Sequence, residues 1–164
     1  MIELEVVGVR IELPSNQPLV LLKEAAGGRH LPIWIGAPEA SAIAFVQQGI
    51  IPPRPMTHDL LVNVVNAIGR SIKEARIVAV EETVYHAELV FDDGTAVSAR
   101  ASDAIAVALR ASCPVLCAEE VLEAAGVEIS DAEDEDSVDD ANAENEVKQF
   151  REFLADVEPE DFER

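Results

Sequence analysis

The sequence contains few cysteines and few aromatic residues. If Cys113 and Cys117 share a strand, they point to one face about 13 Å apart, which is too far for a disulfide. No second cysteine pair is present to complete a zinc site. We therefore interpret both as small buried apolar residues. Aromatic residues make up 4% of the chain and hydrophobic residues 49%, so the core is expected to be mostly aliphatic.

The sequence also has no long apolar run. No segment reaches the roughly 20 apolar residues that span a bilayer, and no basic region followed by an apolar stretch opens the chain. We expect a cytoplasmic protein with no membrane partner. The phosphate-cradling glycine loop, the Gly-x-Ser-x-Gly elbow and the His-Glu-x-x-His zinc motif are all missing. Any chemistry must therefore come from another arrangement of polar residues.

Basic residues are scarce. The chain has 12 Lys and Arg against 32 Asp and Glu, a net charge of −20. Residues 1–128 carry −8 of this charge and residues 129–164 carry −12. Such a surface repels a polyanion at long range and argues against tight nonspecific binding of nucleic acid. Local arginines or a bound metal ion would have to offset that repulsion at any nucleic-acid site.

The pattern of apolar residues predicts an α+β domain over residues 1–128, with a mixed, mostly antiparallel sheet and about four short helices. Strands are expected at 2–13, with a bulge beside Gly8, and at 19–25, 30–35, 72–81, 83–91, 95–99 and 114–118. Helices are expected at 38–48, 57–68, 102–111 and 119–125. Thr57 and Ser102 are the predicted N-caps of the second and third helices. Trp34 is expected to be partly buried.

The C-terminal region differs in composition. Residues 129–146 form an acidic, low-complexity stretch that predicts a disordered linker. Residues 147–164 then predict an amphipathic helix and tail, with Val147, Phe150, Leu154 and Val157 on one face. A helix this short needs a surface to dock on. We therefore expect a homo-oligomer, most simply a two-fold dimer, to which this helix contributes.

Six polar residues lie next to predicted helix starts: Glu39, Arg54, His58, Asp59, Arg100 and Asp103. The simple interpretation is structural, because acidic side chains near a helix start suit the helix dipole. Arg54 or Arg100 would then only pair with Asp103 or Asp59. The functional interpretation is that these residues act together on a phosphate. Histidine and carboxylates can bind a divalent metal or transfer protons, and arginine suits phosphate through its forked donors.

Three segments carry a resemblance to a known family. They are LPIWIG at 31–36 followed by Glu39-Ala40, PRPMTHDLL at 53–61, and RASDAIA at 100–106. In this order they resemble the signature of the bifunctional nuclease family, and a similar tail lies at 150–162. The resemblance implies DNase and RNase activity. It also implies that the shared glutamate, Glu39, belongs to the site.

Two hypotheses follow. The first is a nuclease dependent on a divalent metal, Mg²⁺ or Mn²⁺, that hydrolyses phosphodiester bonds of DNA or RNA. In this hypothesis His58, Asp59 and Asp103 are catalytic, Arg54 and Arg100 bind phosphate, and Glu39, Asp59 and Asp103 are the candidate metal ligands. The second is a non-catalytic oligomeric module for binding or regulation. The acidic surface and the structural interpretation of every candidate residue favour this second hypothesis.

Overall fold

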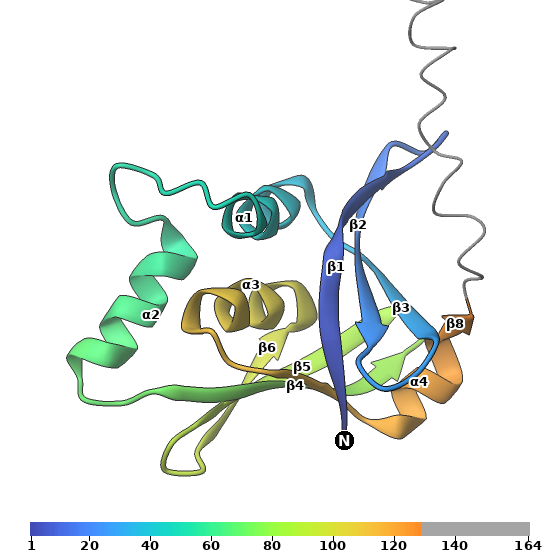
Figure 1. The fold of residues 1–164 in the computed structure, drawn as a ribbon. Helices are drawn as coiled ribbons and strands as arrows, with labels where there is room; N and C mark the ends of the chain where they lie inside the picture. Colours follow the sequence, from blue (N-terminus) through green and yellow to red (C-terminus); the bar gives the residue numbers. More distant parts are fainter. Residues whose placement is uncertain (129–164) are drawn as a thin grey trace, which may run out of the picture. The chain divides into compact units, whose positions relative to one another are not determined.

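Eight strands and four helices make up residues 1–128, the part of the chain that the structure, a computed structural model, describes (Figure 1). In chain order they are β1 (Ile2–Glu12), β2 (Gln17–Glu24), β3 (Arg29–Trp34), α1 (Ala37–Gln47), α2 (Thr57–Ala67), β4 (Ile72–Glu81), β5 (Val84–Phe91), β6 (Ala96–Arg100), α3 (Ala101–Ala111), β7 (Val115–Cys117), α4 (Glu119–Ala125) and β8 (Val127–Glu128). The linker predicted at 129–146 and the helix predicted at 147–164 lie outside the described residues.

All eight strands join one sheet, in the order β6-β5-β4-β7-β1-β2-β3-β8. Every neighbouring pair is antiparallel except β4 and β7, which run parallel. The predicted α+β class with a mixed, mostly antiparallel sheet is therefore confirmed. The bulge expected beside Gly8 is also present, as a register shift between Val6 and Gly8 where β1 pairs with β2.

The sheet is strongly curled. Strands β3 and β5 are separated by four other strands in the sheet order. Even so, the Tyr85 hydroxyl on β5 donates a hydrogen bond to the carbonyl of Pro32 on β3, at 3.3 Å. Helix α4 likewise contacts both β3 and β4. The curl therefore brings the end of β3 close to the start of β5, two segments far apart in the sequence.

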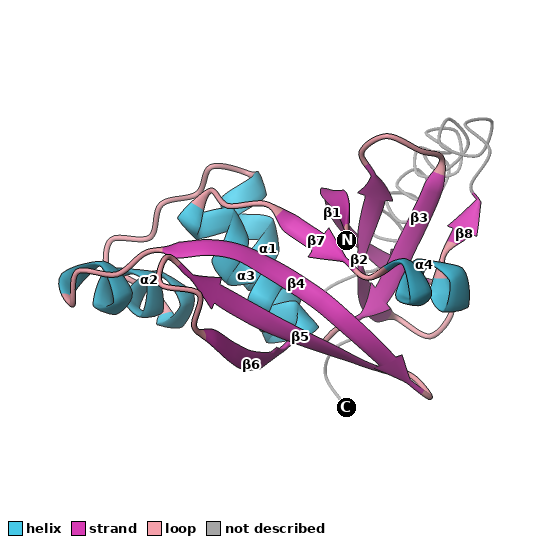
Figure 2. Ribbon diagram, turned by 90° about the horizontal axis from the view of Figure 1, so that it is seen from below, coloured by secondary structure: helices cyan, strands magenta, loops and turns pink. Residues whose placement is uncertain are grey.

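Helix α3 is the centre of the helical layer. It packs on β4, β5 and β6, and both α1 and α2 pack against it, while α1 also covers β1 and β2. In Figure 2 the strands β4–β6 lie in front and α1 and α3 lie behind them. Four alanines of α3, together with Ile105 and Val107, are buried. Small side chains let the neighbouring elements approach this helix closely.

The two predicted N-caps are wrong, by one residue at α2 and by two residues at α3. Helix α2 already begins at Thr57, with extended Met56 as its N-cap, and α3 begins at Ala101, with extended Arg100 as its N-cap. The physical reason at α2 is that the Asp59 carboxylate accepts the Met56 N–H at 2.8 Å, so the helical turn closes one residue earlier. The predicted helix ends are close to the observed ones: Gly49 and Gly69 follow α1 and α2 with φ of +66° and +76°.

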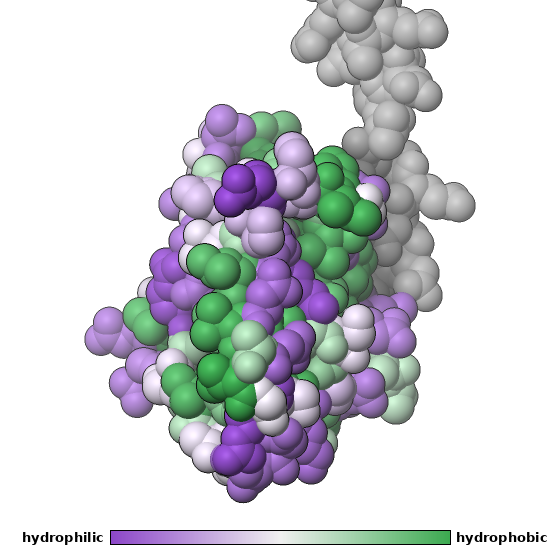
Figure 3. All heavy atoms as spheres, turned by 90° about the vertical axis from the view of Figure 1, so that its left-hand side faces the viewer, coloured by the Kyte–Doolittle hydropathy of each residue, from purple (hydrophilic) through white to green (hydrophobic). Residues whose placement is uncertain are grey.

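Helix α2 has an apolar face that is mostly not part of the core. Val65 is the one buried residue of this helix, whereas Leu60, Leu61, Val64 and Ile68 are exposed. Helix α2 has α3 as its main partner, so one edge of its apolar stripe is covered and the rest faces outward. Figure 3 shows apolar side chains gathered on the side of the molecule that faces left in Figure 1, where α2 lies.

These positions give a direct test of the packing. Replacing fully buried Leu22 by alanine should lower the free energy of unfolding by about 2–5 kcal/mol, because a cavity is left in the core. The same change at Ile11, which lies on β1 and is 54% exposed, should cost less than about 1 kcal/mol. Urea unfolding followed by circular dichroism measures both. Equal losses would contradict this packing.

Candidate active site

Arg100 is the N-cap of α3 and holds carboxylates from two helices. Its Nε donates to Asp103 Oδ2 at 2.7 Å and its Nη2 to Asp103 Oδ1 at 2.9 Å, a forked pair within the first turn of α3. The same Nη2 donates to Glu39 Oε1 at 3.0 Å. Arg100 therefore joins the start of α1 to the start of α3. Its side chain remains 67% exposed, so it is accessible to a ligand.

Glu39 reaches Arg100 because the residue before α1 has no side chain. Gly36 is the N-cap of this helix, and a Cβ atom placed there would lie 2.2 Å from Glu39 Oε2. The Glu39 side chain folds back over Gly36, toward the N-terminus of its own helix, where a negative charge is favourable. An alanine at position 36 would displace this carboxylate.

His58, in the first turn of α2, completes the cluster. Its Nε2 lies 3.2 Å from Asp103 Oδ1, and its side chain is 16% exposed. The starts of three helices thus meet through side chains: Arg100 links α1 to α3, and His58 links α2 to α3. Asp103 takes part in both links.

These four side chains line one cavity of about 590 Å³. Its walls also include apolar side chains from the helices and from β5 and β6, namely Leu61, Leu89, Val97 and Val107. A few polar groups that converge in a largely apolar hollow are typical of a site that binds a small group. The candidates Glu39, His58, Arg100 and Asp103 are therefore brought together.

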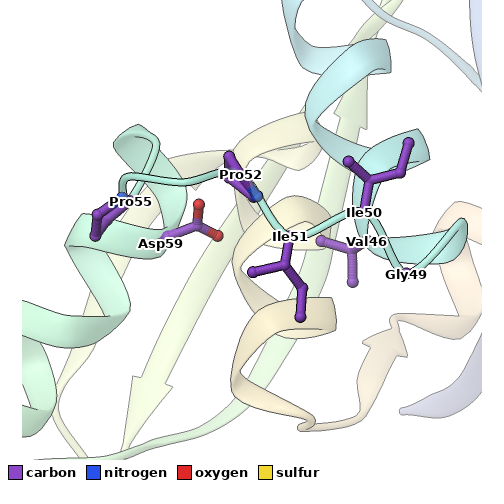
Figure 4. A pocket seen from close by; sticks show the side chains of 7 residues that line it. All are labelled: Val46, Gly49, Ile50, Ile51, Pro52, Pro55 and Asp59. Atoms are coloured by element: carbon purple, nitrogen blue, oxygen red, sulfur yellow. The ribbon is translucent and has the colours of Figure 1, made fainter.

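Asp59 lies apart from this cluster. Its carboxylate accepts a hydrogen bond from Arg110 Nε in the last turn of α3, and Arg110 also donates to the carbonyls of Ala42 at 3.1 Å and Ala106 at 2.9 Å. Asp59 lines a different hollow of about 330 Å³, shown in Figure 4, whose other walls come from α1 and the 49–55 loop. Its predicted catalytic and metal-binding role stays a prediction, and the contacts seen here are structural.

Arg54 is also separate from the cluster. It lies in the exposed loop between α1 and α2 and does not line the cavity of His58 and Asp103. Within residues 1–128 it makes no hydrogen bond or ion pair. Its proposed role in phosphate binding stays a prediction.

The charges of the cluster shift the acidity of its members. Burial alone would raise the pKa of Asp103, but hydrogen bonds from Arg100 and His58 and the charges of both outweigh it, so this pKa is lowered. The pKa of Asp59 is lowered in the same way: burial raises it, and the Met56 N–H and Arg110 more than compensate. The pKa of Arg100 is raised by Asp103 and then by Glu39. Both aspartates are thus held as carboxylates at neutral pH.

The cluster does not fit a divalent metal in the arrangement seen here. The guanidinium of Arg100 already binds the carboxylates of Glu39 and Asp103, which would be needed as ligands. Within the described residues no group of three or more His, Cys, Asp or Glu side chains could hold a metal ion. The predicted need for Mg²⁺ or Mn²⁺ stays a prediction.

Two residues near the site were not among the sequence candidates. Arg110 is 7% exposed, and the only sequence signal for it is a basic residue in the last turn of a helix. Trp34 was expected to be partly buried and is 50% exposed. It lines a second hollow, of about 400 Å³, that shares Arg100 with the cavity of His58 and Asp103. Both cysteines are free; Cys117 is buried as expected, whereas Cys113 is half-buried.

The comparison with known families agrees with the motifs that make up this site. Residues 20–130 match the bifunctional nuclease domain, a span that covers most of the chain and all four residues of the cluster. The chain therefore belongs to the bifunctional nuclease domain family. Within residues 1–128, none of the helices is both long enough and apolar enough to cross a membrane.

Two similar proteins come from Mycobacterium tuberculosis. They are uncharacterized proteins of strain CDC 1551 / Oshkosh and strain ATCC 25618 / H37Rv. Each is 52% identical to this chain over 160 residues, which is 98% of this chain and 97% of the relative. The similarity therefore extends over nearly the whole length of both proteins.

The lowered pKa of Asp59 predicts how stability depends on pH. Its ion pair with Arg110 stabilises the fold above the ordinary aspartate pKa of about 3.9, and this stabilisation is lost as pH falls through the lower folded-state pKa. Asp59→Asn should cost about 1–3 kcal/mol at pH 7, because buried Arg110 loses its partner. The difference from wild type should shrink below about pH 4.

Urea unfolding at several pH values measures this difference. Asp92→Asn, on the exposed turn between β5 and β6, is the matched control and should change little. Parallel stability curves for wild type and Asp59→Asn between pH 7 and pH 2 would contradict the account.

Proposed function

We propose that this chain hydrolyses phosphodiester bonds of nucleic acid in the cavity of His58, Arg100 and Asp103. One observation carries the proposal. A histidine held by a carboxylate and a cation that can bind phosphate line the same partly apolar cavity. Membership of the bifunctional nuclease domain family supports it.

His58 is the proposed general base. When its Nε2 carries the hydrogen that Asp103 accepts, the other ring nitrogen, Nδ1, presents a lone pair. That nitrogen takes a proton from the attacking oxygen, a water or the 2′-hydroxyl of RNA, as the new bond to phosphorus forms. The bond to the leaving oxygen breaks, and the protonated imidazole returns a proton to it. Asp103 orients the ring and stabilises its cationic form.

Arg100 is the proposed phosphate-binding group. Its hydrogen bonds to Asp103 and Glu39 use Nε and Nη2, and none of the bonds within the described residues uses Nη1. The Nη1 donors are therefore available to a phosphate oxygen, on which negative charge grows in the transition state. The two carboxylates hold the guanidinium in place, so little side-chain freedom is lost when the phosphate binds.

The non-catalytic module remains the second candidate, and one observation favours it. Both carboxylates of the cluster, Glu39 and Asp103, are paired with Arg100, and Asp59 is paired with Arg110. Ion pairs of this kind can serve only to fasten helix starts together. Activity measurements on variants that keep the fold separate the two candidates.

Purified wild-type protein should cleave single-stranded DNA or RNA. Asp103→Asn and His58→Ala should each lower the rate by at least about 100-fold, because the base is lost or wrongly oriented. Asp92→Asn, the same chemical change on an exposed turn that does not line the cavity, should keep wild-type activity. Rates with Mg²⁺, with Mn²⁺ and with EDTA test the predicted metal requirement in the same assay.

Every variant is purified in the same way, so a contaminating nuclease would give equal cleavage in all preparations. Equal cleavage by wild type, Asp103→Asn and His58→Ala would contradict the proposal. Circular dichroism of each variant shows whether the fold is kept. A complete lack of cleavage by folded wild-type protein under all three metal conditions would favour the non-catalytic module.

A further inference from the structure

We propose that the hollow beside the active site binds an unpaired nucleobase stacked on Trp34, so that the substrate is single-stranded nucleic acid. This inference rests on the proposed function, because it places the base next to the phosphate held by Arg100. Three observations carry it: the exposure of Trp34, the shape and lining of the hollow, and the charge of the domain.

Trp34 is presented to solvent in a fixed orientation. It is the last residue of β3 and is 50% exposed. Its indole Nε1 donates to Glu12 Oε2 on β1 at 2.9 Å, which satisfies the polar end of the ring and limits its rotation. This is the only tryptophan of the chain, in a sequence with 4% aromatic residues. A large exposed ring that is held in place is a suitable surface for stacking a base.

The hollow has room for a base and polar groups to contact it. Its volume is about 400 Å³, and it is lined by Trp34, Tyr85, Gln17 and the N-cap Arg100, among others. The curl of the sheet creates it, since β3 and β5 meet here. The side chain of Gln17 supplies an acceptor and donors for the edge of a base. Because Arg100 also lines the catalytic cavity, base and phosphate sites are adjacent.

The charge of the domain favours stacking over ionic binding. Residues 1–128 carry a net charge of −8, which opposes binding of nucleic acid through many phosphate contacts. Stacking on an aromatic ring does not require positive charge and contributes substantially for each base. A double helix keeps its bases stacked internally, so an unpaired base is the form that Trp34 can bind. Few phosphate contacts also mean that binding depends weakly on salt.

Binding can be measured without catalysis. In the His58→Ala chain, which leaves Trp34 and Arg100 in place, a short oligothymidylate should quench the fluorescence of Trp34. An abasic oligomer of the same length, with the same phosphates, should quench it little. In a plot of the logarithm of the affinity against the logarithm of the salt concentration, the slope should be about −0.7. This is the value for one phosphate contact on a single strand.

Variants of Trp34 give the second measurement, by fluorescence anisotropy of a labelled oligothymidylate. Trp34→Ala should weaken binding by roughly 5- to 150-fold, the loss expected for one stacked base. Trp34→Phe keeps a ring and should retain most of the affinity. Ile11→Ala, an exposed apolar residue on β1, is the control and should bind like wild type.

The outcomes separate this inference from the proposed function. Equal binding of the abasic oligomer, or unchanged binding by Trp34→Ala, would overturn the base site while leaving hydrolysis possible. Base-dependent quenching with no hydrolysis by the wild-type chain would support the base site and contradict the proposed function. A slope steeper than about −3 would mean several phosphate contacts and would also overturn the inference.

The exposed face of α2 carries a second, independent inference: we infer that it is the interface between two copies of this chain. Apolar side chains on this helix and the preceding loop are widely exposed: Ile51 by 90%, Ile68 by 70%, Leu60 by 54% and Val64 by 51%. Figure 3 shows an apolar surface on the side of the molecule where α2 lies. A patch of this kind on a soluble domain marks an interaction site.

Charge identifies a second copy as the occupant. Between residues 50 and 68 only Arg54 and Asp59 are charged, and Asp59 is bound to Arg110, whereas the whole chain carries −20. Two acidic copies repel each other at most faces, but a two-fold axis can pair this nearly uncharged face with itself.

Sedimentation of the full chain at micromolar concentration tests this interface. Wild type should be a dimer, and the double variant Leu60→Glu, Val64→Glu should be a monomer with an unchanged circular dichroism spectrum. Ile11→Glu, at an equally exposed site on β1, should stay dimeric. A monomeric wild type would overturn the inference. The inference would also be overturned if the double variant Phe150→Glu, Leu154→Glu dissociated the dimer while the α2 variant remained a dimer.

Discussion

Arg100 holds three carboxylate oxygens from two helices, both of Asp103 and one of Glu39. Each carboxylate alone suits the start of its helix, but two of them close together repel each other. The guanidinium offsets that repulsion, and His58 adds the third helix by its contact with Asp103. The starts of α1, α2 and α3 can therefore meet at one point. Arg110, at the other end of α3, fastens α1 and α2 from the opposite side.

This constraint is compatible with the proposed phosphate site in an acidic protein. Two carboxylates hold the guanidinium of Arg100 in place, so its Nη1 donors would act at one phosphate without attracting a long polyanion. The apolar walls of the cavity strengthen the electrostatic interactions inside it. The curled sheet then places an exposed aromatic ring within the adjoining hollow. The proposed base and phosphate sites together therefore do not require a basic surface.

Local patterns predicted most of the fold. Strand alternation, the bulge at Gly8 and the glycines after the helices placed nearly every element, because these signals depend on neighbouring residues alone. The site was predicted less completely. The sequence indicated that acidic residues begin the helices, but the direction of each carboxylate depends on which arginine it meets. Asp59 therefore turned to Arg110, which no local pattern marks, and away from His58's cavity. The outward face of α2 was missed for the same reason, since periodicity shows that a face is apolar and not what covers it.

The central claim is that Asp103 fixes the ring of His58 so that Nδ1 is free to accept a proton. Nitrogen-15 NMR of the histidine side chains tests this directly, since the chain has three histidines and a His58→Gln variant assigns the signal. In the neutral ring, Nε2 should carry the hydrogen and Nδ1 should show the shift of an unprotonated nitrogen. The Asp103→Asn variant should lose this preference. A neutral His58 with its hydrogen on Nδ1 would contradict the account.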